Sequence, residues 1–550
     1  MEEIKLSGNN NSIFVINNKL DFIKSIIYIF SEHKELIYSI IKKLDIEELS
    51  SLNNKLAEII QEINKTDIKI FCNIIGKIYK KTNSAITIGI ENNYIDRVYR
   101  DSYYMHFSQK HQEVSRYCKR LIFFKGIQSD NILNLCKEEL QDNIIGSMVI
   151  RPLKNKSIGR TLINPQYFYR NKKEAYIRIT NYKINYLGIE LQIEAFPYFT
   201  QDSATTTCAE VSLLNVLDYY SNHYSDYKFL TPSDINKIVK INNFDRTLPT
   251  TGLSYETISK ILCESGFSPK FYFKNKNIKE NNVIKFISYY IESGIPVCIG
   301  LNPINKETNN KILTIGHSVI CIGHGSCDFD LKHTKYEIDN VISTTYTYTS
   351  FIIQDDNNIP YAEYKIEEEK LIYNNVNYKI DCFVVPLYKR MYMDAQKAEN
   401  TVLSILNNKK EFLNIDSNDN STIIYRLFLA SSRHFKSHRI HKVEKHSDIQ
   451  KIYMETPLPQ FIWICELYNS QGFKNNDIIG EIIIDATYSG LNLLDSILMI
   501  SYKNRYIARN NSSQSIFEGL KPLDPFISNN TFKCARYNLN LNNYNSSTDI

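Results

Sequence analysis

Cys208 heads a run of residues with helical spacing, in the segment TTTCAEVSLLNVLDYY (205–220). The apolar residues behind it recur every three or four positions, which predicts an amphipathic helix held by core packing. Thr206 or Thr207 would cap this helix, so the cysteine falls in its first turn. The free N–H groups and the dipole of a helix N-terminus stabilise an anion, so a thiol placed there is favoured as a thiolate. The pattern predicts a cysteine nucleophile for covalent catalysis.

A structural cysteine is the alternative interpretation, because cysteine is among the residue types most often buried. The other cysteines provide a contrast. Cys298, Cys321 and Cys382 lie inside apolar runs typical of strands, where a thiol is normally inert, and Cys263 lies within a predicted helix. Cys208 differs from these in standing at a predicted helix start.

His317 and His324, in ILTIGHSVICIGHG (312–325), are the candidate bases for such a nucleophile. His317 follows Gly316 and opens an apolar strand, a position from which the ring can project into a cleft. His324 lies between two glycines and is typical of a turn. A structural histidine is the alternative interpretation of His317.

Asp355 and Asp356 could orient the imidazole, because they stand where the apolar strand TSFIIQDD (349–356) runs into a turn. We prefer Asp355, because alternating residues of a strand share a face and Phe351 and Ile353 lie on its side. Two aspartates that only stabilise the turn are the alternative interpretation.

The order of these features resembles the papain-like fold. Within that fold it is most similar to the C39-like cysteine peptidases, relatives of the double-glycine leader peptidases of bacteriocin transporters. The resemblance rests on the cysteine that heads a helix, on the strands GIPVCIGLN (294–302) and GHSVICIG (316–323), and on the apolar strand that ends in an aspartate. It covers roughly residues 196–390.

The resemblance implies a catalytic triad of Cys208, His317 and Asp355. In the family, a glutamine upstream of the cysteine contributes to the oxyanion hole, and the matching residue here is Gln201. This glutamine lies one residue farther from the cysteine than is usual. The segment 326–349, between the histidine and the aspartate, is an insertion long enough to form a flap or an added hairpin.

The elements that must position these residues fall into three regions. Residues 1–195 are predicted to be helical and then, from about residue 140, rich in strands. Residues 196–395 alternate helix and strand signals, and residues 396–550 form a mixed α/β region whose tail, after about residue 530, is expected to be frayed. The expected fold class is α+β, with a papain-like cysteine-protease domain, its helix-borne cysteine packed on an antiparallel sheet, between the two flanking regions.

Composition limits the class of protein. The chain has 550 residues, more than one hydrophobic core usually supports, which predicts several domains. Its net charge of +5, from 65 basic and 60 acidic residues, gives no case for a nucleic-acid partner. No apolar run reaches the ~18–20 residues of a membrane span. Eleven cysteines without a CxxC pair are typical of reduced thiols, so we expect a cytoplasmic protein.

Two other clusters suggest different functions. The segment RHFKSHRIHKVEKHSD (433–448) could bind a metal or a polyanion, but its lysines oppose a cation, and we interpret it as a solvated basic face. Its histidines are His434, His438, His441 and His446. The segment 96–121 mixes Arg and Tyr as nucleic-acid surfaces do, and it equally suits a helix packed on the N-terminal region. We expect neither a cofactor nor a metal ion.

These residues together predict a cysteine hydrolase that cleaves a peptide or isopeptide bond through a thioester, with a protein or peptide as its substrate. An acyltransferase or amide synthase that uses the same triad is the alternative within the same chemistry. A binding or regulatory scaffold that keeps the fold without turnover is the alternative from another class. The sequence leaves the oligomeric state and the cleavage specificity open.

Overall fold

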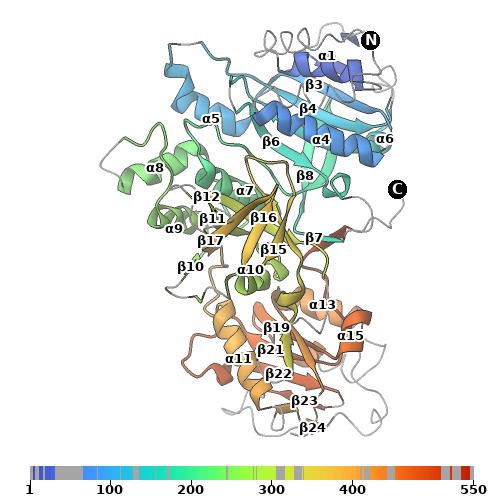
Figure 1. Ribbon diagram of the computed structural model, residues 1–550, viewed down its shortest axis with the longest axis vertical. Helices are drawn as coiled ribbons and strands as arrows, with labels where there is room; N and C mark the ends of the chain where they lie inside the picture. The colour runs from blue at the N-terminus through green and yellow to red at the C-terminus, as the bar shows by residue number, and fades with distance from the viewer. Residues whose placement is uncertain are drawn as a thin grey trace.

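The computed structural model describes residues 4–5, 11–16, 19–30 and 66–544. Within the last range it leaves out residues 128–134, 170–173, 305–315, 328–336, 414–420, 443–452, 510–520 and 523–533, and shorter interruptions of one to three residues. The described residues form an N-terminal, a central and a C-terminal part, which follow one another along the long axis of the molecule (Figure 1).

The N-terminal part is built on a six-stranded sheet in which strands β1 to β6 follow one another in chain order. Each pair of neighbours is antiparallel. Helices α1 and α4 pack on this sheet, since Phe22 and Phe71 share one core with Ile88 and Phe123. The elements are β1 (Ile4–Lys5), β2 (Asn11–Ile16), α1 (Lys19–Ile29), α4 (Thr66–Thr82), β3 (Ile86–Tyr94), α5 (Arg97–Met105), β4 (Cys118–Lys125), α6 (Lys137–Asn143), β5 (Ile144–Ile150), β6 (Ile158–Ile163), β8 (Thr180–Tyr186) and β9 (Ile189–Ala195).

Strands begin earlier in the N-terminal part than the sequence predicts. Strands β2, β3 and β4 all precede residue 140. Their apolar runs, such as ITIGI at 86–90, are buried in the sheet. The spacing of such a run fits either a helix or a strand, and its tertiary packing makes it a strand. In the segment 96–121, the described residues form α5 and the start of β4. Residues 31–65, within the stretch predicted to be helical, lie outside the described residues.

The central part holds a nine-stranded sheet in the order β10-β17-β16-β15-β14-β12-β7-β26, with β11 paired to β12 and β17. All its pairs are antiparallel, in agreement with the predicted α+β class. Helix α7, which carries the cysteine, contacts β12. The elements are β7 (Ala175–Ile177), α7 (Cys208–His223), α8 (Pro232–Asn242), α9 (Tyr255–Glu264), β10 (Lys270–Phe273), α10 (Val283–Glu292), β11 (Val297–Ile304), β12 (His317–His324), β14 (Ser350–Gln354), β15 (Ala362–Glu367), β16 (Lys370–Tyr373), β17 (Val376–Val385) and β26 (Asn542–Tyr544).

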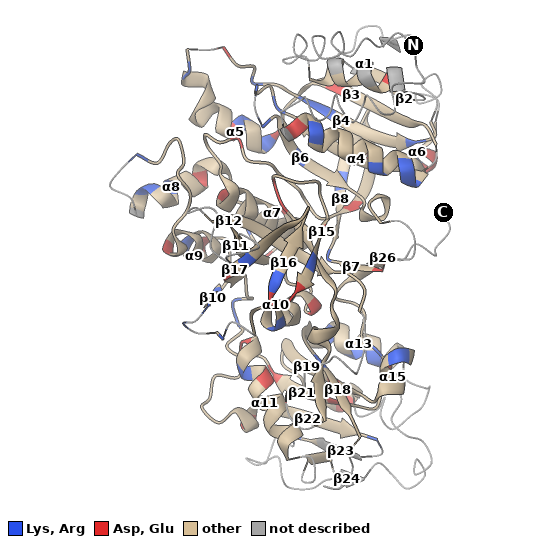
Figure 2. Cartoon of the chain, in the orientation of Figure 1, with Lys and Arg blue, Asp and Glu red and all other residues tan. Residues whose placement is uncertain are grey.

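The C-terminal part is a seven-stranded sheet in the order β13-β18-β19-β21-β22-β23-β24, with the small pair β20 and β25 beside it. Its elements are β13 (Val341–Ser343), α11 (Ala395–Asn407), β18 (Ile423–Ser431), α13 (Ser432–Lys442), β19 (Phe461–Tyr468), α15 (Ser470–Asn475), β20 (Asp477–Ile478), β21 (Gly480–Asp485), β22 (Ile497–Tyr502), β23 (Arg505–Ala508), β24 (Lys521–Pro522) and β25 (Cys534–Ala535). Basic and acidic residues are interspersed over all three parts (Figure 2). Within the described residues, no helix is both long enough and apolar enough to cross a membrane.

Short strands connect the three parts in ways that chain order does not predict. The tail after residue 530 is not frayed throughout, because β26 pairs with β7 at the edge of the central sheet, with Tyr544 opposite Ala175. The insertion at 326–349 contributes β13, which runs parallel to β18 of the C-terminal sheet. The two ends of the insertion pair with each other, with Cys327 opposite Tyr348 in an antiparallel bridge, so its base continues the hairpin of β12 and β14. Residues 328–336 lie outside the described residues.

The basic segment 433–448 is only partly solvated, which corrects the sequence interpretation. His438 and Arg439 on α13 are buried, and Arg439 is fully covered. The Arg439 guanidinium forms ion pairs of 2.9 and 2.8 Å with Glu466 and Glu481. A buried charge is tolerated when it is paired in this way, and sequence spacing does not reveal its partners. Residues 443–448 of the segment lie outside the described residues.

Helix α7 is buried around most of its circumference, so it is not amphipathic as the sequence predicts. Ten of its sixteen residues are buried. Leu214 and Leu217 belong to one continuous core that also contains Phe123 of the N-terminal sheet and Ile320 of the central sheet. The helix therefore lies between two parts of the chain, and each part covers one side of it.

We predict that residues 196–395, expressed alone, will not form a stable monomer. The fragment would expose the side of α7 that the N-terminal part covers, and a contiguous exposed apolar surface of this kind drives association. Size-exclusion chromatography and thermal unfolding by circular dichroism would compare the fragment with the whole chain. A monomeric fragment with a cooperative unfolding transition would contradict the prediction.

Candidate active site

Cys208 is the first residue of α7, and the start of this helix is fixed by a capping box. Thr207 is the N-cap, and its amide donates a hydrogen bond of 3.1 Å to Oε2 of Glu210. The hydroxyl of Thr250 donates to Oε1 of the same carboxylate at 2.5 Å. Glu210 is buried, so these contacts hold the first turn firmly. The thiol itself is half-buried and faces a cavity.

The turn that leads from Gln201 to Cys208 is held by the carboxylate of Asp202. Its Oδ1 accepts hydrogen bonds from the amides of Ala204, Thr205 and Thr206, at 2.9, 2.7 and 2.9 Å. Three N–H groups that converge on one carboxylate oxygen fix the path of the backbone. Both Gln201 and Cys208 line the same cavity as a result.

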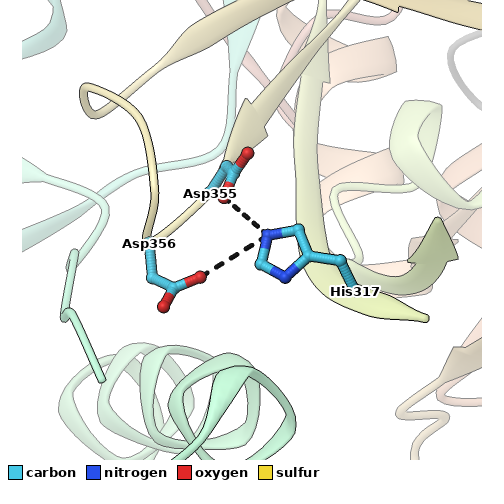
Figure 3. A group of neighbouring side chains, drawn as sticks. All are labelled: His317, Asp355 and Asp356. Atoms are coloured by element: carbon cyan, nitrogen blue, oxygen red, sulfur yellow. Dashed lines mark hydrogen bonds and ion pairs between the residues drawn. The ribbon is translucent and has the colours of Figure 1, made fainter. Parts of the chain in front are cut away.

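His317 is the first residue of β12, opposite Leu301 of β11. Strand β14 pairs with β12 on the other side, and Asp355 follows directly after its last residue. His317 Nε2 lies 2.7 Å from Oδ1 of Asp355 (Figure 3). Cys208 lines the same cavity as His317 and contributes to the raised pKa of the imidazole. Because Nε2 faces the aspartate, Nδ1 is the nitrogen available to the thiol.

The charges of this group favour an imidazolium. Burial opposes the charge, but the hydrogen bond with Asp355 and the contribution of Cys208 outweigh it and raise the pKa of His317 from 6.5 to about 11. Burial would also raise the pKa of Asp355, yet its hydrogen bond with His317 lowers that pKa from 3.8 to about 2. A positive imidazolium beside Cys208 at neutral pH is the arrangement that stabilises a thiolate.

Asp355 is the better placed of the two aspartates. Its Oδ2 accepts hydrogen bonds of 2.6 Å from both the side-chain Nδ2 of Asn358 and the hydroxyl of Tyr364. Its Oδ1 accepts from the backbone amide of Asn357 at 3.0 Å in addition to His317. A carboxylate with all its lone pairs engaged can hold the imidazole in one orientation.

Asp356 is buried but less engaged. Its Oδ1 lies 3.5 Å from Nε2 of His317, and neither carboxylate oxygen has a hydrogen-bond partner among the described residues (Figure 3). Burial and the neighbouring charge of Asp355 raise its pKa. The geometry therefore favours Asp355 as the partner of the histidine.

His317, Asp355 and Asp356 are also close enough together to hold a metal ion, since one ligand atom of each lies within 4.8 Å of the others. Nε2 of His317 would have to be the nitrogen ligand. In the hydrogen-bonded arrangement this nitrogen donates its proton to Asp355, so a bound cation and the hydrogen bond exclude each other. The full set of hydrogen bonds around Asp355 fits the hydrogen-bonded arrangement better than a metal site.

A cavity of about 670 Å³ opens beside Cys208 and His317. It lies between the start of α7, the loop before α9 and the strands β10, β11, β12 and β17. Its lining residues are Gln201, Thr207, Cys208, Ala209, Ser212, Leu213, Thr251, Gly252, Leu253, Ser254, Tyr255, Ile258, Phe271, Cys298, Ile299, Gly300, Gly316, His317, Ser318, Cys382, Phe383 and Val384. The volume is in the range of small-molecule and peptide sites.

The N-terminal part supports this site through the segment 151–160, which sequence analysis did not identify. Arg151 is buried and donates hydrogen bonds to the carbonyl oxygen and hydroxyl of Thr200, at 3.2 and 2.9 Å, and to the carbonyl of Gln201, at 3.2 Å. Arg160 forms a bidentate pair with Asp218 of α7, with two contacts of 3.0 Å. One signal in the sequence could have identified Arg151. It directly follows the apolar run SMVI, and an arginine in that position is expected to be buried and to need several hydrogen-bond acceptors.

The same segment reaches the other side of the site. The ammonium of Lys156 donates a hydrogen bond of 3.0 Å to the side-chain oxygen of Asn357. The amide nitrogen of Asn357 lies 3.3 Å from Nε2 of His317. Both the turn before the cysteine and the turn after the aspartate are thus held by the N-terminal part.

No protein-family model matches the chain, and no curated protein has a significantly similar sequence.

We predict that Arg151→Met will lower the free energy of unfolding by about 2–5 kcal/mol, because it leaves several buried carbonyl oxygens without a donor. Lys156→Met is the matched control. Its ammonium is exposed, so its loss should cost less than about 1 kcal/mol. Urea unfolding of both variants measures the difference, and equal losses would contradict a special role for Arg151.

Proposed function

We propose that the chain is a papain-like cysteine hydrolase, related to the C39-like peptidases, that cleaves a peptide or isopeptide bond through a thioester. The observation that carries this proposal is the position of His317, which is hydrogen-bonded to Asp355 and lines the same open cavity as Cys208. All eleven cysteines are free thiols, which suits action in a reducing compartment such as the cytoplasm.

In the proposed reaction, the Cys208 thiolate attacks the carbonyl carbon of the scissile bond and forms a tetrahedral intermediate. The negative oxygen of this intermediate would accept hydrogen bonds from the Cys208 backbone amide and from the Gln201 side chain. As the intermediate collapses, the C–N bond breaks, and the His317 imidazolium gives its proton to the departing amine. The acyl group remains on the sulfur as a thioester.

Hydrolysis of the thioester completes the cycle. His317, now neutral, takes a proton from water, and the resulting hydroxide attacks the thioester carbonyl. The C–S bond breaks, the carboxylic acid is released, and the thiolate–imidazolium pair is restored. Asp355 holds the imidazole in the orientation required for both steps. If an amine instead of water accepts the acyl group, the same site is an amide synthase, which analysis of the products would reveal.

We predict that iodoacetamide will alkylate Cys208 rapidly at pH 6. The imidazolium of His317 persists across pH 5–9, because the pKa of His317 is raised to about 11, so its positive charge favours the thiolate over this whole range. His317→Ala removes the positive charge, and the reaction at pH 6 should slow by at least about tenfold, because an ordinary thiol with a pKa of ~8.5 is only ~0.3% ionised there. Mass spectrometry of the labelled peptides gives the rate at each cysteine.

Cys263, exposed near the end of α9, is the internal reference in this experiment. Its rate should rise with pH in both proteins. Cys208→Ser should remove the rapid label and any hydrolysis while leaving the protein folded. Identical profiles for Cys208 in the wild type and in His317→Ala would mean that the two residues do not act together, and would favour a scaffold without turnover.

We predict that Asp355→Asn will reduce hydrolysis far more than Asp356→Asn. Only Asp355 accepts a short hydrogen bond from the imidazole, and the loss of an equivalent carboxylate costs up to about 10⁴-fold in turnover. Asp356→Asn should cost less than about tenfold. Single-turnover release of a fluorophore from a peptidyl coumarin measures both variants, and the reverse ranking would assign the role to Asp356.

A further inference from the structure

Among the described residues that line the cavity beside Cys208, the charged side chains are limited to the thiolate–imidazolium pair of the proposed function. None of its lining residues is Asp, Glu, Lys or Arg. The chain as a whole is 23% charged, and its charged residues are spread over all three parts, so an uncharged surface of this size is a local property (Figure 2). Away from Cys208 and His317, the described lining residues offer no charged partner to a group that enters the cavity.

The cavity has an apolar wall, which we define as the lining residues Leu253, Tyr255, Ile258, Phe271 and Val384. These residues come from the loop before α9, from α9 itself and from strands β10 and β17. The rings of Tyr255 and Phe271 pack edge to face with their centres 6.2 Å apart. The Tyr255 hydroxyl lies 3.2 Å from the sulfur of Cys382, which turns the polar end of that ring toward β17. The apolar wall is therefore already assembled without a ligand.

The size of the cavity indicates how large the bound group is. A volume of about 670 Å³ is in the middle of the range for sites that enclose a whole small molecule. A pair of glycines would leave the apolar wall exposed to water. A charged side chain that lies against the apolar wall would lose its hydration without gaining a charged partner among the described lining residues, which is costly.

On the basis of the proposed function, we infer that the substrate carries bulky, uncharged, apolar groups on the acyl side of the scissile bond. The acyl side is the part that stays covalently attached to Cys208 in the thioester. The cavity begins at this residue and continues along Ala209 and Ser212 of α7 to the apolar wall. The apolar wall would hold the acyl group while the amine leaves and water enters.

A series of peptidyl acyloxymethyl ketones with one electrophile and different residues before it tests the inference on the full-length protein. The second-order rate of labelling at Cys208 should be about 10–100-fold higher for Leu-Phe than for Gly-Gly, since burying one large apolar side chain contributes about 1.5–3 kcal/mol. Lys-Lys and Glu-Glu should be slower than Leu-Phe by at least the same factor. Equal rates across the series, or a preference for Gly-Gly or a charged pair, would overturn the inference.

Ile258→Glu places a charge in the apolar wall, and Ile241→Glu is the matched control on the exposed surface of α8. Ile258→Glu should slow Leu-Phe labelling at least about tenfold and reduce the preference over Lys-Lys, while the control keeps wild-type rates. Phe271→Ala, which adds no charge, should slow Leu-Phe labelling in the same direction. An unchanged preference in both apolar-wall variants would overturn the inference.

Iodoacetamide separates this inference from the proposed function. The reagent is too small to need the apolar wall, so its rate at pH 6 should be the same in Ile258→Glu as in the wild type, which also confirms that the variant is folded. If iodoacetamide reacts with Cys208 no faster than with Cys263, the proposed function fails. If that reaction is rapid and dependent on His317 but the ketone series is flat, only the specificity is wrong.

Discussion

The burial of helix α7 between two sheets is the constraint on which the rest of the structure depends. A helix that is buried around most of its circumference needs more than one sheet to cover it, and α7 shares one core with residues of both the N-terminal and the central sheet. The pair between Arg160 and Asp218 adds a charged contact to this apolar one. The N-terminal part is therefore a structural component of the site, because the helix that presents Cys208 would lack half of its packing without it.

Antiparallel pairing brings the histidine and the aspartate together. Strands β12 and β14 run in opposite directions, so the start of one lies beside the end of the other, where His317 and Asp355 stand. Strand β11 lies on the other flank of β12 and closes the cavity wall with β17. Cys208, His317 and Asp355 thus rest on paired strands and on the first turn of a buried helix, which position side chains more precisely than loops do.

Buried charged residues hold the C-terminal end of strand β12. Glu292, at the end of α10, lies 3.3 Å from Nε2 of His324, the last residue of β12, and pairs with Arg426 of β18. Burial would raise the pKa of Glu292, but the charge of Arg426 lowers it well below its ordinary range. Arg426 also pairs with Glu466 at 2.9 Å. This network joins the central sheet to the C-terminal sheet, so β12 is held by apolar packing near its start and by ion pairs at its end.

The amino-acid sequence by itself determined the local elements of the site. The start of α7 at Cys208, the start of β12 at His317 and the end of β14 before Asp355 all follow from short-range capping, alternation and turn signals. The α+β class and the antiparallel sheet behind the helix were also predictable from these signals. Only the tertiary structure decided which face of α7 is covered, where β7, β13 and β26 pair, and that Arg151 holds the turn at Gln201. These features depend on contacts between residues far apart in the chain. Such contacts leave no periodic pattern in the sequence of either segment that takes part.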